Sequence, residues 1–229
     1  MKHITKIATL FTLSTSLACA FSPNQFYGAV QAGIYRAQFN NKYLDQTDFI
    51  PQNISDSIMQ NGYLGGLTIG YTRLINENYF IGAELTGNIT GNSALYQTGA
   101  ANTAFSDNIQ INRSVDLTVT PGIITKSAFF PYVRVGVSRA SVLDHLTSPV
   151  GYNPVMTQYN TNQNVNGFVA GLGVRYIIND RGWLFVETNY HDYGTVNFSS
   201  FQNFSASYSH SAHVYSYAAL IGAAYAFNV

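Results

Sequence analysis

The sequence has little charge and no long apolar run. Only 10% of its 229 residues are charged, against about a quarter in soluble domains, so much of its surface is expected to face something other than water. No apolar stretch approaches the roughly 20 residues that a transmembrane helix needs. The formal net charge is zero, which argues against a nucleic-acid partner because phosphate binding depends on lysine and arginine.

Cysteine is almost absent, and the one copy lies in a stretch with the composition of a secretory signal peptide. Residues 1–20 combine a lysine-bearing start, a short apolar core at 7–17 and the small–x–small site Ala18-Cys19-Ala20. We therefore expect a signal peptide at 1–20 and one mature domain at 21–229 that has no thiol for disulfides. A lipoprotein acylated at Cys19, or a buried N-terminal helix, is the alternative.

Aromatic residues are plentiful, and they follow an alternating pattern. The chain has 17 tyrosines and 15 phenylalanines. The pattern is clearest near the end, where alternate residues share one face of a strand. They are Tyr215, Tyr217, Ala219, Ile221, Ala223, Tyr225 and Phe227. Tyrosines at both ends of an aliphatic face suit a strand that crosses a bilayer, because aromatic rings prefer the two interfaces.

Seven further segments alternate in the same way. They are Phe26–Phe39, Gly62–Ile75, Tyr79–Thr90, Ser114–Ile124, Phe130–Val142, Gly167–Ile178 and Trp183–Tyr193. Each is about ten residues or slightly longer, the length that a tilted membrane strand needs. The opposite faces carry mostly Gly, Thr, Ser and Asn, which suit the narrow lumen of a small barrel better than a solvated surface.

The connections alternate between short and long. Short connections rich in turn-forming residues fall at 76–78, 125–129 and 179–182, and long polar loops are expected at 40–61, 91–113, 143–166 and 194–212. Short periplasmic turns with long external loops are typical of outer-membrane barrels. We therefore predict an all-β fold, an eight-stranded antiparallel up-and-down transmembrane β-barrel, in preference to a lipocalin-like soluble barrel.

Several charged residues have the parity of the lumen face. They are Glu84, Asp116, Arg134, Arg175 and Glu187. Counted from the short turns, all except Asp116 fall at a similar height in their strands. We predict that these four pair with one another in one layer, because an unpaired buried charge is costly. A salt-bridged plug that fills the core is one interpretation of this layer, and an ion gate is the other.

Other charged residues have the parity of the lipid face. Arg36, Arg139 and Asp192 each lie about 23 Å above the periplasmic end of their strands, from a rise of about 3.3 Å per residue and a tilt near 45°. The apolar band of such barrels is about 25 Å tall. We predict that these residues lie at the outer rim, and that Arg36 and Arg139 contact lipopolysaccharide phosphates there.

The histidines are the candidates for catalysis. His191 and Asp192 are neighbours in a strand and point to opposite faces, so they cannot form a dyad with each other. A loop conformation could still bring His191, His210 and Ser211 together, which keeps a lipid A-modifying enzyme as the alternative function. His210 and His213 alone do not make a closed metal site. We therefore assign no catalytic residue, metal or cofactor.

Four motifs resemble those of the small OmpA/OmpX/opacity-type outer membrane proteins. They are Gly65–Tyr71 (GGLTIGY), Gly167–Tyr176 (GFVAGLGVRY), Val186–Gly194 (VETNYHDYG) and the terminal ALIGAAYAF. The resemblance covers nearly the whole chain and implies a protein of a Gram-negative outer membrane, surrounded by membrane lipid and lipopolysaccharide. Relatives serve as structural components, adhesins or immune-evasion proteins through variable loops.

From this resemblance and the polar loops we expect a monomeric, non-catalytic protein with a structural or adhesin-type role at the cell surface. Function on a rigid barrel tends to lie in its loops, so a host surface ligand is the expected partner there. A small porin is a third hypothesis, after the lipid A-modifying enzyme.

Overall fold

The computed structural model describes residues 24–45, 52–92, 97–98, 105–147, 159–203 and 206–227, and these are almost entirely β-strand. The strands are β1 (Asn24–Asp45), β2 (Gln52–Asn76), β3 (Tyr79–Asn92), β4 (Gln97–Thr98), β5 (Phe105–Ile123), β6 (Phe129–Thr147), β7 (Tyr159–Ile177), β8 (Gly182–Asn203) and β9 (Ala206–Phe227). No helix in these ranges is long and apolar enough to cross a membrane. The signal peptide expected at 1–20, with Cys19, lies outside the described residues.

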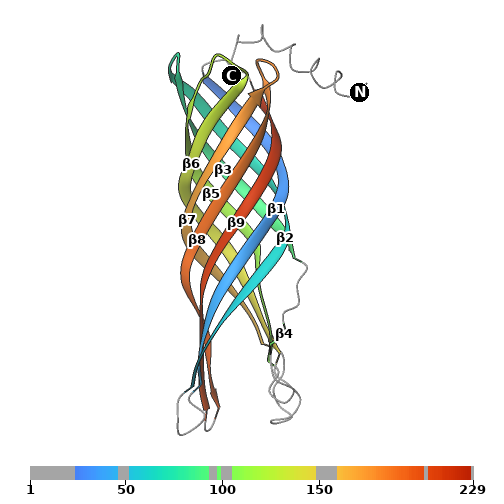
Figure 1. The fold of residues 1–229 in the computed structure, drawn as a ribbon, viewed down its shortest axis with the longest axis vertical. Helices are drawn as coiled ribbons and strands as arrows, with labels where there is room; N and C mark the ends of the chain where they lie inside the picture. Colours follow the sequence, from blue (N-terminus) through green and yellow to red (C-terminus); the bar gives the residue numbers. More distant parts are fainter. Residues whose placement is uncertain are drawn as a thin grey trace, which may run out of the picture.

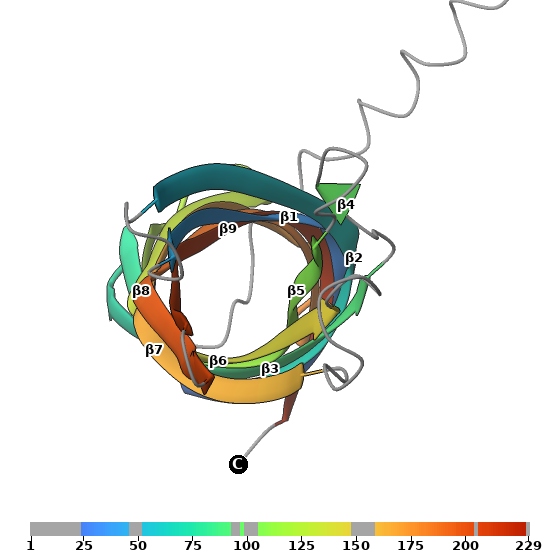
Figure 2. The ribbon, with the colours of Figure 1, turned by 90° about the horizontal axis from the view of Figure 1, so that it is seen from below.

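The strands close into a barrel. Consecutive long strands pair antiparallel, and β1 pairs with β9 along a ladder that begins at Phe26↔Phe227. β3 pairs directly with β5 as far as Ile89↔Arg113, and the two-residue β4 pairs with β5 beyond that point, at Phe105 and Ser106. Setting β4 aside, the eight long strands form the ring seen end-on in Figure 2. The predicted eight-stranded antiparallel up-and-down barrel is confirmed.

The two faces of each strand differ as the sequence alternation predicts. On β9, Ile221 is 61% exposed on the outside, whereas the next residue inward, Leu220, is 4% exposed. The outward faces of all eight long strands carry large apolar residues, among them Val30, Leu67, Leu85, Leu117, Val135, Leu172, Val186 and Ile221. This apolar band suits lipid, and the closed ladder leaves no unpaired strand edge beside it.

The long connections are mostly strand, and the prediction of long loops at 40–61, 91–113, 143–166 and 194–212 is wrong in extent. The β1–β2 ladder continues to Asp45↔Gln52, and the β8–β9 ladder continues to Asn203↔Ala206. Outside the apolar band the outward face of a strand meets water. A polar sequence there is therefore compatible with a strand and does not indicate a loop.

Beyond the membrane band the barrel divides into two sheets. The β7–β8 ladder ends at Phe168↔Asp192, and β3 ends its ladders with β2 at Gly62↔Asn92 and with β5 at Ile89↔Arg113. The other ladders between long strands continue. One sheet contains β2, β1, β9 and β8, and the other contains β7, β6, β5 and β4. Their ends form two separate groups in the lower part of Figure 1. Inward-facing apolar residues, including Phe39, Val142, Phe198 and Val214, belong to one buried cluster between these sheets.

Inside the other end of the barrel, aromatic rings lie over glycines of the neighbouring strand. The four cross-strand pairs are Tyr27–Gly70, Phe80–Gly122, Tyr132–Gly173 and Phe185–Gly222. A Cβ atom added at any of these glycines would overlap the facing ring. Glycine therefore allows a large ring to lie flat against the wall of a lumen that has room for little more than side chains.

Candidate functional site: lumen charge cluster and outer rim

The described lumen side chains form three layers along the barrel axis. The layer nearest the short turns is aromatic and includes Phe80, Phe130, Trp183 and Phe185. The middle layer is charged, and the layer toward the two sheets is the apolar cluster already described. A cavity of about 10 Å³ remains in the charged layer, which is about the room for one water molecule.

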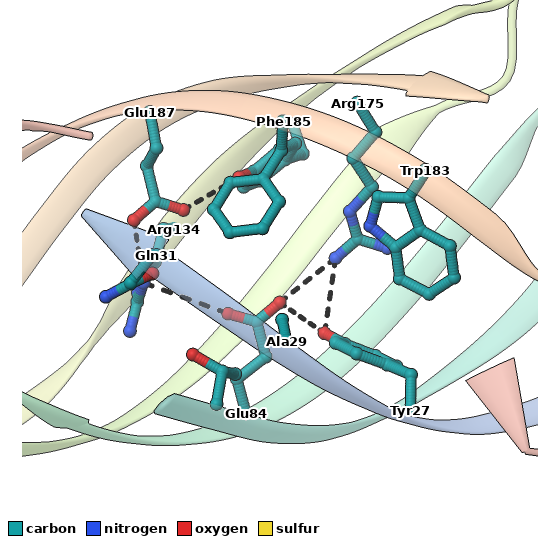
Figure 3. A pocket seen from close by; sticks show the side chains of 11 residues that line it. Tyr27, Ala29, Gln31, Glu84, Arg134, Arg175, Trp183, Phe185 and Glu187 are labelled. Atoms are coloured by element: carbon teal, nitrogen blue, oxygen red, sulfur yellow. Dashed lines mark hydrogen bonds and ion pairs between the residues drawn. The ribbon is translucent and has the colours of Figure 1, made fainter. Parts of the chain in front are cut away.

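Arg175 lies at the boundary between the aromatic and charged layers (Figure 3). Its Nη2 atom lies 3.0 Å from Oε1 of Glu84, and the Tyr27 hydroxyl donates to the same carboxylate oxygen at 2.5 Å. Its guanidinium also lies 4.9 to 5.7 Å from the centres of four rings. These rings are Tyr27, Phe80, Tyr132 and Trp183. The buried cation is thus stabilised by one carboxylate and by ring faces.

Arg134 forms a second buried ion pair. Its Nη1 atom lies 2.7 Å from Oε1 of Glu187, whose other carboxylate oxygen accepts a 2.7 Å hydrogen bond from the Tyr132 hydroxyl. The Nη2 atom of Arg134 donates to the Thr86 hydroxyl at 2.9 Å. Arg134 also lies 3.9 Å from Glu84, so the two ion pairs form one connected cluster.

Asp116 extends this cluster toward the outer apolar layer. One carboxylate oxygen accepts from the Ser138 hydroxyl at 2.6 Å, and the other lies 3.2 Å from Asn88 Nδ2 and 3.3 Å from His191 Nε2. Arg134 Nη2 is 3.8 Å from the same carboxylate. A count of residues from the short turns places Asp116 outside the predicted charged layer. In the structure it lies at the adjoining level and contacts Arg134 of that layer.

The structure brings the five lumen residues Glu84, Asp116, Arg134, Arg175 and Glu187 together, all of them buried. Sequence reasoning missed their uncharged partners, chiefly Tyr27, Thr86, Asn88, Tyr132 and His191. Lumen-face parity was the available signal for four of them, because Thr86, Asn88, Tyr132 and His191 alternate in phase with a lumen charge on their own strand. Tyr27 lies on β1, which carries none of the five lumen charges. In the described part of the chain, no group of three or more His, Cys, Asp or Glu residues could hold a metal ion.

Arg36 and Arg139 point outward and are exposed. They lie on β1 and β6, which are on opposite sides of the eight-stranded ring. Arg36 Nε donates to Asn61 Oδ1 at 2.7 Å. Arg139 is next to a residue that sequence reasoning missed, Arg113 of β5, since the β5–β6 ladder places Arg113 opposite Ser141. Contact between these arginines and lipopolysaccharide stays a prediction.

The structure does not bring His191 and Ser211 together. Both lie in strands, and His191 is buried in the lumen while Ser211 belongs to the outward set of β9. The loop-gathered site suggested from the sequence is therefore wrong for this pair, and the side chain of His210 lies outside the described set. Asp192 instead pairs on the outer face with His213, whose Nε2 atom is 3.4 Å from its carboxylate.

Spin labels can test the height of the two rim arginines. Labels at positions 36 and 139 are expected to report the headgroup region. These residues lie on the same outward faces as the apolar Ile34 and Val137, two residues farther from the short turns. Labels at Val30 and Val135 are expected to report hydrocarbon. Electron paramagnetic resonance with oxygen and a polar nickel complex as relaxation agents measures this difference, and deep burial at 36 or 139 would contradict the register.

The closed barrel, the outward apolar band and the filled lumen together define a small outer-membrane β-barrel protein. A protein from Coxiella burnetii (strain RSA 493 / Nine Mile phase I), described as uncharacterized, is 29% identical over 216 residues, which cover 86% of this chain and 82% of the relative. No protein family model matches the sequence.

A solved structure of an outer-membrane barrel, that of OprG, has the same fold. The outer membrane protein OprG from Pseudomonas aeruginosa is 14% identical with a TM-score of 0.52, and the match covers 92% of this chain and 100% of OprG. The attachment invasion locus protein Ail of Yersinia pestis is 9% identical with a TM-score of 0.41, covering 88% of this chain and 98% of Ail. At these identities, the similarity concerns the fold alone.

Proposed function

We propose that this protein is a non-catalytic surface protein of the outer membrane, acting as a structural component or adhesin through the part that projects from the membrane. The observation that carries this proposal is the division of the projecting strands into two sheets. Beyond Phe168↔Asp192, residues 195–203 of β8 and 159–167 of β7 continue without a ladder between them. In the described ladders, residues 52–61 of β2 likewise pair only with β1.

An unpaired strand edge can accept another extended chain. Its free N–H and C=O groups form a ready ladder for a partner strand. The edge of β8 is covered at one point, where Gln163 Nε2 donates to the carbonyl of Asn197 at 2.9 Å. These edges belong to the part of the strands that projects beyond the apolar band, so they support recognition of an extended protein segment on a host surface.

The filled lumen supports the same proposal and disfavours the small porin. Aromatic and apolar layers lie on either side of the charge cluster, and all five charged side chains have partners within the protein. We infer that the cluster is a structural plug. Removing one charged residue from such a buried network lowers the stability of the fold, because its partner is left as an uncompensated charge.

Removal of one projecting hairpin tests the surface role. Residues 195–211 of β8 and β9 would be replaced by an Asn-Gly turn, and whole cells would be assayed on fibronectin- and laminin-coated surfaces. We expect adhesion to fall to the level of a deletion strain, while the barrel keeps its heat-modifiable gel mobility. Equal adhesion with and without the hairpin, on every surface, would contradict the role of the β8 edge.

One observation favours a lipid A-modifying enzyme as the second candidate. His213 and Asp192 pair on the outward face, and Ser211 precedes His213 by two residues on the same face of β9. A serine, an imidazole and a carboxylate are the groups of a hydrolytic triad. Mass spectra of lipid A from wild-type and deletion strains separate the two candidates, and identical spectra are expected from the non-catalytic proposal.

A further inference from the structure

A groove lies on the outer wall of the barrel, with Arg36 toward its outer end. It extends across β2, β1, β9, β8 and β7 and has a volume of about 920 Å³. Its floor consists of small side chains, because Ala219 of β9 lies beside Thr188 of β8, with Ala170 on β7. Larger residues border it, namely Ile34, Met59, Tyr63, Leu172 and Tyr190.

A row of polar and aromatic side chains lies on the same outer wall, two residues farther along each strand from the short turns than this floor. The ladders place Arg36 opposite Tyr217, and Tyr217 opposite Tyr190. The two tyrosine ring centres are 5.0 Å apart. Asn61 fixes Arg36 through its Nε atom at 2.7 Å, which leaves the terminal guanidinium nitrogens to donate elsewhere. Among the described residues, no carboxylate lies within ion-pair distance of Arg36.

The carboxylate on the outer face near this row is already engaged. Asp192 lies on β8, two strands from Arg36 and level with Gln38, so it is more than about 10 Å from Arg36. It accepts from the Gly194 backbone N–H at 2.8 Å and lies 3.4 Å from His213 Nε2. Gly194 has a φ of 67°, and the ladder shifts register between Asp192 and Thr195. This β-bulge directs the Gly194 N–H to Asp192. Arg36 therefore has no carboxylate partner from this row among the described residues.

We propose that the groove binds one lipopolysaccharide molecule, with an acyl chain along the Ala219 floor and a lipid A phosphate at Arg36. Arg36 lies two residues beyond Ile34, which is 61% exposed and is the last large apolar residue on the outward face of β1 among its described side chains. The guanidinium of Arg36 is therefore at the height of a lipid A phosphate, and the apolar groove is at the height of the acyl chains of the same molecule. A planar guanidinium donates two parallel hydrogen bonds to phosphate, and Tyr190 and Tyr217 offer ring faces at the interface. This site is separate from the strand edges of the proposed surface role.

Paired substitutions on the purified protein in neutral detergent test the site. Lipopolysaccharide would be titrated and its dissociation constant compared with that of phosphatidylglycerol. Ala219→Leu fills the groove, and Ala223→Leu makes the same change four residues away on the same outward face of β9. Arg36→Gln removes the cation, and Arg73→Gln is its control near the other end of the barrel. We expect Ala219→Leu and Arg36→Gln each to weaken lipopolysaccharide binding roughly tenfold, with both controls unchanged.

Three results would overturn the proposal. Equal weakening by Ala223→Leu would mean that lipid contacts the whole wall without a built groove. Equal affinity for phosphatidylglycerol would mean that any anionic phospholipid serves. Dimers in lipid-free detergent that Ala219→Leu abolishes would mean that a second copy of the chain occupies the groove.

Discussion

Replacing Arg175 with alanine is expected to lower the free energy of unfolding by about 3–5 kcal/mol, the usual cost of removing one partner of a buried ion pair. Glu84 would lose the cation 3.0 Å from its carboxylate and stay buried with a net charge. The rings around the guanidinium would also lose their central contact. Because the residual charge is the main cost, removing Glu84 together with Arg175 should destabilise the barrel by less than the sum of the two single changes.

The single tryptophan of the chain offers the measurement. Trp183 lies 5.5 Å from the Arg175 guanidinium, so its fluorescence follows urea unfolding at the affected layer of the barrel in detergent micelles. Arg73→Ala, at an exposed position, is the control and should change the midpoint little. Unchanged midpoints for both Arg134→Ala and Arg175→Ala would show that the cluster does not stabilise the barrel.

Replacing Gly173 with valine is the second change with a large expected effect. A Cβ at this position would overlap the ring of Tyr132, whose hydroxyl donates to Glu187 at 2.7 Å. Displacing the ring costs about 1–3 kcal/mol by overpacking, and loss of a hydrogen bond to a charged group adds about 1.5–3 kcal/mol. We expect the barrel to lose about 3–5 kcal/mol in urea titrations.

A matched control separates this overlap from the general effect of replacing glycine in a strand. Gly87 is exposed on β3, and no described atom lies within 4 Å of a Cβ added there. Gly87→Val should therefore leave the unfolding midpoint nearly unchanged. Similar losses for the two variants would mean that backbone effects, and not contact with the Tyr132 ring, decide the stability.

The barrel was predictable because one physical constraint acts along each membrane-crossing strand. Lipid on one side and a narrow lumen on the other force strict alternation, as in Tyr217, Ala219 and Ile221 against Ala218 and Leu220. The projecting strands were not predictable in this way. Beyond the band, water covers the outward face, so the polar residues of the projecting part of β1 and β2 resemble a loop in composition although they continue the ladder to Asp45↔Gln52.

Parity also placed the lumen charges on the correct face, but it could not determine which of these residues contact one another. Strands of a barrel are tilted and staggered, so residues at equal counts from the turns differ in height and direction across the lumen. Arg175 of β7 contacts Glu84 of β3 from across the barrel, and Arg134 of β6 contacts Glu187 of β8. A search for charged residues with lumen-face parity does not find uncharged partners such as Tyr27 and Thr86.

The filled interior has a consequence for the cell that carries this protein. The described side chains occupy the lumen in three layers and leave only about 10 Å³ in the charged one. If the proposed structural role is correct, each copy adds surface to the outer membrane without adding a wide route through its lumen for antibiotics or detergents. We therefore expect the permeability of the outer membrane to small antibiotics to be the same in a strain that overproduces this protein, which an open barrel would not allow.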